Sequence, residues 1–367
     1  MENKTLEDIF QLKEYSLSSK EKEEVLLPII KEGVKRARRN PQIDSFLEKE
    51  SFDSEKISSL SQIPGVPIQM FKDIDLSTCD KKDIIQILKS SGTTSSEQSK
   101  VPLNQETLIN QGRAFQSSIV NYFGSEKRVF LVIDHKGIID PKREITSRTA
   151  IVRAPLRYAK ETYFLLKETE DGRLVLDMDV INEVIRKHSN DDIIAFGFTY
   201  IVWSVFYKQA KDAGISFKFP NLKLFHAGGW KKLSEEKVSK EAFSKELARL
   251  FGISYKEVCD FYGMAEQNGV IFIDCKEGNK HVPNFAKVII RDTQTLEPVQ
   301  KGQTGIIEIM SALGTSYYSQ AILTEDLGEY LGDDDCPCGR HGEYFRFKGR
   351  LKKAPLRGCG DTFKEKK

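Results

Sequence analysis

The sequence predicts an α/β fold in which at least one sheet is mostly parallel. Short apolar runs with the composition of buried strands recur along the chain, and segments with helical spacing separate several of them. The chain has 367 residues, of which 39% are hydrophobic and 30% charged. This globular composition and length allow one large α/β unit or two domains.

The first 60 residues predict a helical layer, because Glu, Lys, Leu and Ile recur there at helical spacing and turn residues are scarce before Pro64. A short apolar run at 82–89 then predicts a strand. This strand leads into the Ser, Thr and Gly-rich loop 90–96.

Further strands are predicted where β-branched and aromatic residues concentrate between turn residues. These runs are 129–134, 193–198, 223–226, 258–262, 270–273, 286–291 and 304–310. Helical patterns at 180–188, 200–213 and 237–251 separate several of them. From Gly349 the chain is basic, rich in glycine and without a core pattern, which predicts a mobile tail.

The charge balance gives no sign of a nucleic-acid or membrane partner. Lys and Arg number 56 against 54 Asp and Glu, and the signs are interspersed, so no footprint for nucleic acid or for a membrane surface is evident. The longest apolar run, 193–207, is too short for membrane insertion, and the N-terminus lacks a signal-peptide pattern. Six cysteines suit a reducing cytoplasm better than a disulfide framework. We expect a cytoplasmic protein, and its state as a homo- or hetero-oligomer stays open.

The loop 90–96 has the composition that a phosphate site requires. Its hydroxyls and the backbone N–H groups around Gly92 can approach a phosphate, and Lys100 lies just beyond. No Gly-Lys-Ser/Thr follows, so this is not a P-loop, and an ordinary surface loop is the alternative.

Later segments carry weaker signals of the same kind. The pair Gly228-Gly229 follows a predicted strand and is either a site of close backbone approach or a tight turn. Glu266 follows the run that ends at Tyr262, and it is either a Mg²⁺ ligand or a solvated carboxylate. The segment 324–328 predicts an acidic turn in which Asp326 could accept hydrogen bonds from ribose hydroxyls.

Two further groups of residues have alternative interpretations. One group has the residue types of a structural zinc site, three cysteines and one histidine, namely Cys275, His281, Cys336 and Cys338. The alternative is that these residues bind no metal. Cys275 and Cys336 are far apart in the sequence, so only the fold could bring the group together. Four aromatic residues either line a binding pocket or are ordinary core residues, namely Phe196, Tyr200, Trp203 and Trp230.

The order of these motifs is similar to that in the acyl-adenylate-forming superfamily. Five segments carry a narrower resemblance within that superfamily: Ser90-Ser91-Gly92-Thr93, Gly228-Gly229-Trp230-Lys231, His281-Val282-Pro283, Thr324 to Gly328 and Arg357-Gly358-Cys359. By these segments, and over about its whole length, the chain resembles the acyl-protein synthetase family of bacterial bioluminescence. That family is the fatty-acid-activating subunit of a fatty acid reductase complex, also called long-chain-fatty-acid luciferin-component ligase.

The resemblance implies a fold and a domain organisation. Residues 1–350 would form the large N-terminal domain of the acyl-adenylate-forming fold, with mixed, mostly parallel sheets flanked by helices and the helical layer at 1–60. The full C-terminal lid domain would be lacking, and residues 351–367 would be a mobile tail that carries the acyl-acceptor cysteine.

The resemblance also implies the cofactors and the roles of single residues. ATP and Mg²⁺ would be used, with Glu266 as the Mg²⁺ ligand and Cys359 as the acylated nucleophile. The remaining implied ATP-binding residues are Ser91, Gly92, Thr93 and Thr94 at the phosphates, Gly228, Gly229 and Tyr262 at the adenine, and Asp326 and Arg350 at the ribose. By the same resemblance, the superfamily's lid lysine would be lacking, and Lys100, Lys352, Lys353 or a partner subunit would supply that charge. The acyl pocket would be lined by Phe196, Tyr200, Trp203 and Trp230.

The implied chemistry has two steps. The carboxylate of a fatty acid or other carboxylic acid attacks the α-phosphorus of ATP and pyrophosphate departs; a thiolate then attacks the acyl-adenylate. Cys359 suits this role, because its glycine neighbours give mobility and nearby cations lower a thiol pKa. An extended chain from Arg350 to Cys359 spans up to roughly 30 Å, enough to deliver the acyl group to an acyl-CoA or acyl-protein reductase subunit. The alternatives are a phenylacetate-type carboxylate:CoA ligase and a catalytically degenerate scaffold subunit.

Overall fold

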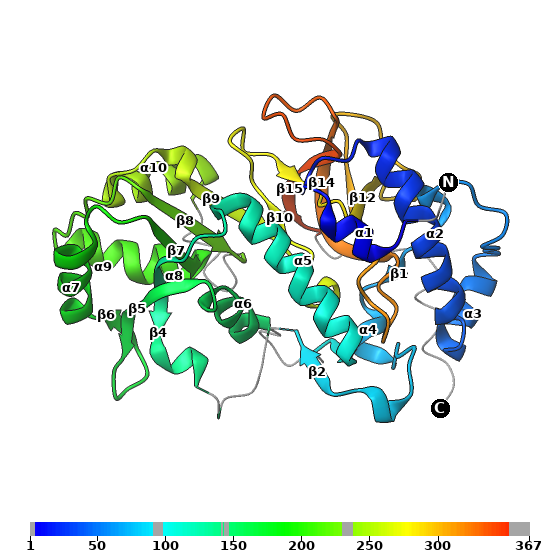
Figure 1. The fold of residues 1–367 in the computed structure, drawn as a ribbon, viewed down its shortest axis with the longest axis horizontal. Helices are drawn as coiled ribbons and strands as arrows, with labels where there is room; N and C mark the ends of the chain where they lie inside the picture. Colours follow the sequence, from blue (N-terminus) through cyan, green and yellow to red (C-terminus); the bar gives the residue numbers. More distant parts are fainter. Residues whose placement is uncertain (1–3, 91–97, 141, 143–146, 230–237, 352–367) are drawn as a thin grey trace. The chain divides into compact units, whose positions relative to one another are not determined.

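The computed structural model describes residues 4–90, 98–140, 142, 147–229 and 238–351 (Figure 1). Six predicted site residues lie outside these ranges, namely Ser91, Gly92, Thr93, Thr94, Trp230 and Cys359. The chain divides into two compact units. Unit 1 comprises Met1–Ser118, Gly263–Phe272 and Asn279–Lys367, and unit 2 comprises Ile119–Tyr262 and Ile273–Gly278. The predicted domain boundary at residue 350 stays a prediction.

The predicted N-terminal helical layer is confirmed. It consists of α1 (Leu6–Gln11), α2 (Ser19–Ala37), α3 (Pro41–Lys49) and the 3₁₀ turn η1 (Leu60–Gln62). Capping boxes begin α1 at Thr5 and α2 at Ser18, and the Asn40 side chain caps α3. Two further helices, α4 (Met70–Asp73) and α5 (Gln105–Phe123), follow, with the 3₁₀ turn η2 (Lys81–Asp83) between them.

The main sheet of unit 1 is largely antiparallel. Its order is β11 (Lys280–His281), β15 (Glu343–Arg350), β14 (Ile322–Asp333), β13 (Thr304–Ser311) and β12 (Ala286–Arg291). The short strand β1 (Val66–Pro67) pairs with β14 in parallel. A separate ribbon joins β2 (Gln86–Lys89) to β3 (Lys100–Leu103).

Two sequence-based predictions about the end of unit 1 are wrong. The segment 324–328 is not an acidic turn, because it lies inside β14 and pairs with both β13 and β15. Gly349 and Arg350 do not belong to a tail, because they are the last residues of β15 and pair with Leu327 and Asp326. Pairing across the sheet orders both segments although their own composition is polar.

The sheet of unit 2 is the mostly parallel sheet that the sequence predicts. Its order is β10 (Phe272–Ile273), β9 (Val258–Tyr262), β8 (Leu222–Ala227), β7 (Ile193–Phe198), β4 (Arg128–His135), β5 (Ala159–Glu168) and β6 (Leu174–Leu176). The chain goes from β4 to β5 on one side and later to β7 on the other, and both neighbours are parallel to β4. The carboxyl ends of β4 and β7 therefore form a topological switch point, where α/β sheets bind ligands.

Helices flank this sheet (Figure 1). They are α6 (Ser147–Leu156), α7 (Met178–His188), α8 (Thr199–Ile201), α9 (Lys208–Asp212) and α10 (Lys240–Phe251), with one π-helical turn, η4, at Val202–Tyr207. The three predicted helical segments and the predicted strands of both units are confirmed, apart from shifts at their ends. Among the described residues, no helix has the length and apolarity needed to cross a membrane.

Candidate active site

Glu266 is a buried carboxylate whose backbone is fixed from several sides. It lies in the 3₁₀ turn η7 (Ala265–Gln267) of unit 1, and only 4% of its surface is exposed. The Tyr317 hydroxyl donates to the Glu266 carbonyl at 2.9 Å, and Gln111 in turn donates to Tyr317 at 3.2 Å. The next residue, Gln267, donates to the Ser319 carbonyl at 2.7 Å. This scaffold holds the position of the carboxylate.

The charge of Glu266 is poorly compensated. Burial raises the pKa of its carboxyl group, while the Ser99 hydroxyl and the positive charges of Lys72 and Arg350 act against that rise. Among the residues that the structure describes, none forms an ion pair with Glu266. A divalent cation with oxygen ligands suits such a carboxylate, so Glu266 fits the Mg²⁺ role that the sequence predicts.

The structure brings Asp326 and Arg350 together. They are register partners across β14 and β15, and the Arg350 Nε atom lies 3.7 Å from an Asp326 carboxylate oxygen. The Asp326 side chain is mostly buried, whereas 75% of the Arg350 side chain is exposed. Lys100 is exposed at the start of β3, and its predicted catalytic role stays a prediction.

In unit 2 the predicted adenine residues lie at neighbouring strand ends. Gly228 and Gly229 directly follow β8, and Tyr262 is the last residue of β9. Ala227 and Phe261 are register partners, so the three residues lie at the same carboxyl edge. Gly228 has φ of +80°, a conformation that favours glycine, and both glycines are exposed. Their backbone is therefore accessible to a planar ring.

The acyl-binding candidates of unit 2 differ in their surroundings. Phe196 is buried, with its ring centroid 6.1 Å from that of Phe261, and Tyr200 is half-buried. Trp203 stacks on Tyr207 at 4.5 Å and also contacts Phe243. An open hollow of about 470 Å³ is lined by Trp203, Tyr207, Lys208, Lys211, Asp212 and Glu246. The acyl-binding role of these aromatic residues stays a prediction.

One polar pair at the switch point is not predicted from the sequence. Asp134, near the carboxyl end of β4, is 1% exposed, and its carboxylate lies 2.6 Å from the Arg148 guanidinium. That guanidinium also lies over the ring of Phe198, the last residue of β7, at 5.4 Å. An aspartate that ends the apolar run 129–133 was the available signal.

Three of the four zinc candidates lie in unit 1. His281 is in β11, and Cys336 and Cys338 lie between β14 and β15. Cys338 Sγ is 3.2 Å from His281 Nε2, a contact between two of the predicted ligand atoms. Cys275 belongs to the Ile273–Gly278 segment of unit 2. The zinc role of this Cys₃His set stays a prediction.

The protonation state of His281 also suits a metal ligand. Burial lowers its pKa to about 3, and the positive charges of Arg340 and Lys22 contribute to the shift. The imidazole is therefore neutral at neutral pH, the form that binds zinc, and three of the four ligand residues are buried. This donor set fits a zinc ion better than an exposed acidic cluster would.

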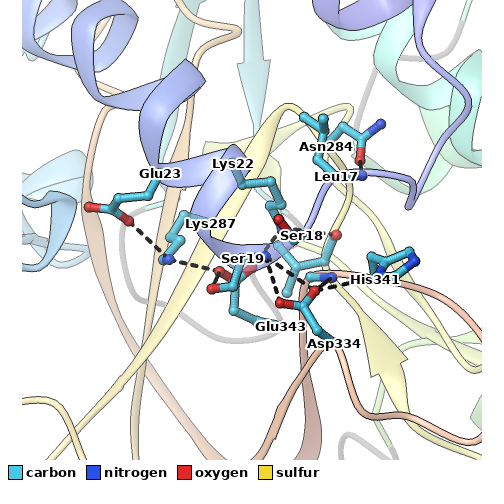
Figure 2. A network of polar contacts seen from close by, with 12 residues as sticks. Leu17, Ser18, Ser19, Lys22, Glu23, Asn284, Lys287, Asp334, His341 and Glu343 are labelled. Carbon is cyan, nitrogen blue, oxygen red and sulfur yellow. Dashed lines mark hydrogen bonds and ion pairs between the residues drawn. The ribbon is translucent and has the colours of Figure 1, made fainter.

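A buried ion-pair network joins the N-terminal layer to the sheet of unit 1 (Figure 2). Lys22 and Lys287 lie 2.6 Å and 2.7 Å from the two carboxylate oxygens of Glu343, and Glu23 lies 3.0 Å from Lys287. The backbone N–H of Ser19 donates to the Asp334 carboxylate at 3.0 Å. These contacts fix α2 against β12, β15 and the segment that carries Cys336 and Cys338.

The comparison with solved structures shows which fold the chain has. The chain has the fold of the acyl-adenylate-forming ligases, and it superposes on a 2-hydroxyisobutyryl-CoA ligase with a bound acyl-adenylate at a TM-score of 0.68. That match has 14% sequence identity and covers 91% of this chain and 69% of the ligase. The open conformation of the same ligase gives a TM-score of 0.67, at 14% identity over 91% of this chain and 76% of the ligase.

The family follows from the sequence comparisons. The model of the acyl-protein synthetase family LuxE matches residues 3–367, so the chain belongs to that family of ligases, as the motifs predict. A long-chain-fatty-acid–luciferin-component ligase of Aliivibrio fischeri is 25% identical over 329 residues, or 87% of this chain and 83% of the relative. Its counterpart from Vibrio harveyi is 24% identical over 315 residues, or 83% and 78%.

Proposed function

We propose that the protein activates a fatty acid with ATP and then carries the acyl group on Cys359. A carboxylate oxygen attacks the α-phosphorus of ATP, and the bond to the leaving pyrophosphate breaks. The Cys359 thiolate then attacks the acyl carbon and AMP departs, so that a thioester conserves the activation. Glu266 carries the proposal: it is a buried, fixed carboxylate without an ion-pair partner among the described residues, in a chain of the acyl-protein synthetase family.

The other residues take the roles that their positions support. Glu266 would hold Mg²⁺, which neutralises charge on the phosphates. Asp326 and Arg350 would hold the ribose, since the carboxylate accepts and the exposed guanidinium donates hydrogen bonds. The remaining assignments are Gly228, Gly229 and Tyr262 for the adenine, Ser91 to Thr94 and Lys100 for the phosphates, and Phe196, Tyr200, Trp203 and Trp230 for the acyl chain.

The substrate and the partner are the finer parts of the proposal. Both curated relatives are named for a long-chain fatty acid, which supports a long-chain acid here. An acyl-CoA or acyl-protein reductase subunit would accept the acyl group from Cys359. The low number of cysteines for a chain of this length supports our placement of the protein in the cytoplasm.

ATP–pyrophosphate exchange tests the activation step. Purified protein with MgATP and labelled pyrophosphate should exchange label only when an acid is present, and long-chain acids should give the highest rates in a panel of fatty and aromatic acids. The scaffold alternative predicts no exchange with any acid. Exchange with aromatic acids alone would contradict the substrate assignment.

The contact between Cys338 and His281 favours one alternative acceptor. A phenylacetate-type ligase would pass the acyl group to coenzyme A and would not need Cys359. Acyl-CoA formation that survives Cys359→Ala would support this alternative. Loss of all acyl transfer in that variant, with exchange retained, would support transfer to Cys359.

We also propose that Cys275, His281, Cys336 and Cys338 bind one structural zinc ion. Elemental analysis should find one zinc per chain, and its removal by a chelator should lower the melting temperature by on the order of 5–10 °C, because metal binding contributes to folding. Cys338→Ser should lose the metal, whereas Cys79→Ser, outside the group, should keep it. Metal-free protein with an unchanged melting temperature in chelator would contradict the proposal.

A further inference from the structure

We propose that Thr324 is a positioning residue for the ribose of ATP, because its side chain fixes the backbone of Asp326. This inference rests on the proposed function, in which Asp326 accepts hydrogen bonds from the ribose hydroxyls. The residues that carry it lie at the end of the main sheet of unit 1, on the neighbouring strands β13, β14 and β15 and the residue that follows β15.

The register between β13 and β14 shifts at the position of Asp326. Residues 324–326 of β14 all fall between two register pairs, whereas β13 has only Ile307 between the same pairs. A bulge of this kind re-aims the side chains of the bulged strand, and bulges are frequent next to active sites. The direction of the Asp326 side chain therefore depends on what holds residues 324–326 in place.

The Thr324 hydroxyl holds this bulge together. It donates a hydrogen bond to the Ile307 carbonyl at 2.7 Å, and it accepts one from the Asp326 N–H at 3.1 Å. The same oxygen lies 3.4 Å from the Asp326 carbonyl. Thr324 is only 2% exposed, so these bonds are shielded from water. One buried hydroxyl thus ties the backbone of Asp326 to the neighbouring strand.

The strand on the other side of β14 also holds Asp326. Asp326 pairs with Arg350 of β15, and just beyond this pair the Leu351 N–H donates to the Glu325 carbonyl at 2.8 Å. The Asp326 side chain is 17% exposed, and one of its carboxylate oxygens lies 3.7 Å from Arg350 Nε. Because Thr324 and β15 fix the backbone from both sides, the carboxylate can meet a ribose hydroxyl without the cost of being ordered first.

The position of the ribose matters for the first step of the reaction. The ribose joins the adenine to the α-phosphate, so a ribose that is held firmly also orients the α-phosphorus for attack by the carboxylate of the acid. Ribose hydroxyls can donate hydrogen bonds to the Asp326 carboxylate, and 2′,3′-dideoxy-ATP lacks them. The binding of that analogue should therefore not depend on Thr324.

Calorimetric titrations with MgATP and with the magnesium complex of 2′,3′-dideoxy-ATP test the role. The parent should bind ATP at least about tenfold more tightly, since a site built for hydroxyls rejects a ligand without them. Thr324→Val keeps the side-chain shape but removes both hydrogen bonds, so ATP should bind about tenfold more weakly and the analogue within about twofold of the parent. Thr324→Ser should recover most of the ATP affinity. Thr304→Val, which removes an exposed hydroxyl of β13, should behave like the parent.

A double substitution shows whether Thr324 acts through Asp326. In the Asp326→Ala background, Thr324→Val should change the ATP affinity by less than about twofold, because the carboxylate that Thr324 positions is gone. A loss of ATP affinity as large as in the parent background would overturn the proposal.

The ratio of the two affinities decides the outcome. A Thr324→Val variant that keeps the parental ratio, whatever its melting temperature, would overturn the positioning role. If that variant does not fold, Thr324→Ala is measured under the same criteria. A parent that exchanges pyrophosphate but binds ATP and the analogue equally would overturn this inference and leave the activation step intact. Exchange with no acid, in a parent whose preference for ATP depends on Thr324, would instead overturn the proposed activation and support the positioning role.

Discussion

Replacing Glu343 by glutamine should lower the free energy of unfolding by about 3–5 kcal/mol, the usual cost of removing one partner from a buried ion pair. The substitution leaves Lys22, which is 0% exposed, and the mostly buried Lys287 without their shared carboxylate. Denaturant unfolding of the parent and the variant measures this difference.

A surface pair on the same helix provides the control. Glu24 lies 4.0 Å from Lys20 on α2, and both side chains are well exposed. Glu24→Gln should change the free energy of unfolding by less than about 1 kcal/mol. If the two variants lose similar amounts, the buried network does not anchor the N-terminal layer.

The network also predicts a dependence of stability on pH. Burial alone would raise the pKa of Glu343, but Lys22 and Lys287 outweigh it and hold the pKa at about 2. In the unfolded chain this carboxyl titrates near its ordinary value of 4.5, so between these pH values the unfolded state binds more protons. The contribution of Glu343 is therefore complete above that range and is lost as the pH falls from about 4.5 toward 2. Parent and Glu343→Gln should accordingly converge in stability in acid.

Glu266→Gln should lower the rate of ATP–pyrophosphate exchange by a factor on the order of 1,000, because the neutral amide cannot hold Mg²⁺ beside the phosphates. The melting temperature should stay the same or rise, because burial raises the pKa of Glu266 and its charge is costly in the folded state. The exchange rate and the melting temperature measure both effects.

Glu308 provides a matched control for Glu266. It is another fully buried glutamate of unit 1, but it pairs with Arg291 at 2.6 Å. Glu308→Gln should lower the melting temperature and leave the exchange rate of the folded protein near that of the parent. Exchange by Glu266→Gln within tenfold of the parent would exclude Glu266 as the Mg²⁺ ligand.

Segments whose burial is evident from composition could be predicted from the sequence. Strand β7 is buried along its whole length, so its residues 193–198 form a continuous apolar run, and β8 behaves almost the same way. Strand β14 could not be predicted, because its acidic residues and Gly328 are typical of a turn. Its pairing with β13 and β15 outweighs these local preferences.

Motif order proposes Glu266, Asp326 and Arg350 as candidates, but it does not predict their surroundings. The register that places Asp326 opposite Arg350 arises from the sheet. Lys22 lies in a Lys- and Glu-rich helix that looks solvated, and only the tertiary fold buries it. The same holds for two of the zinc candidates, since His281 and Cys338 are far apart in the sequence and the fold brings His281 Nε2 to 3.2 Å from Cys338 Sγ.

The mass of the intact protein after turnover tests the central claim most directly. Incubation with MgATP and a long-chain saturated fatty acid should add the mass of the acid minus one water to the chain. Peptide mapping should place this mass on the peptide that contains Cys359, and neutral hydroxylamine should remove it. Cys359→Ser should lack the hydroxylamine-labile adduct while retaining ATP–pyrophosphate exchange. A hydroxylamine-labile adduct of the same mass on Cys359→Ser, or no adduct on a parent that exchanges, would contradict the account.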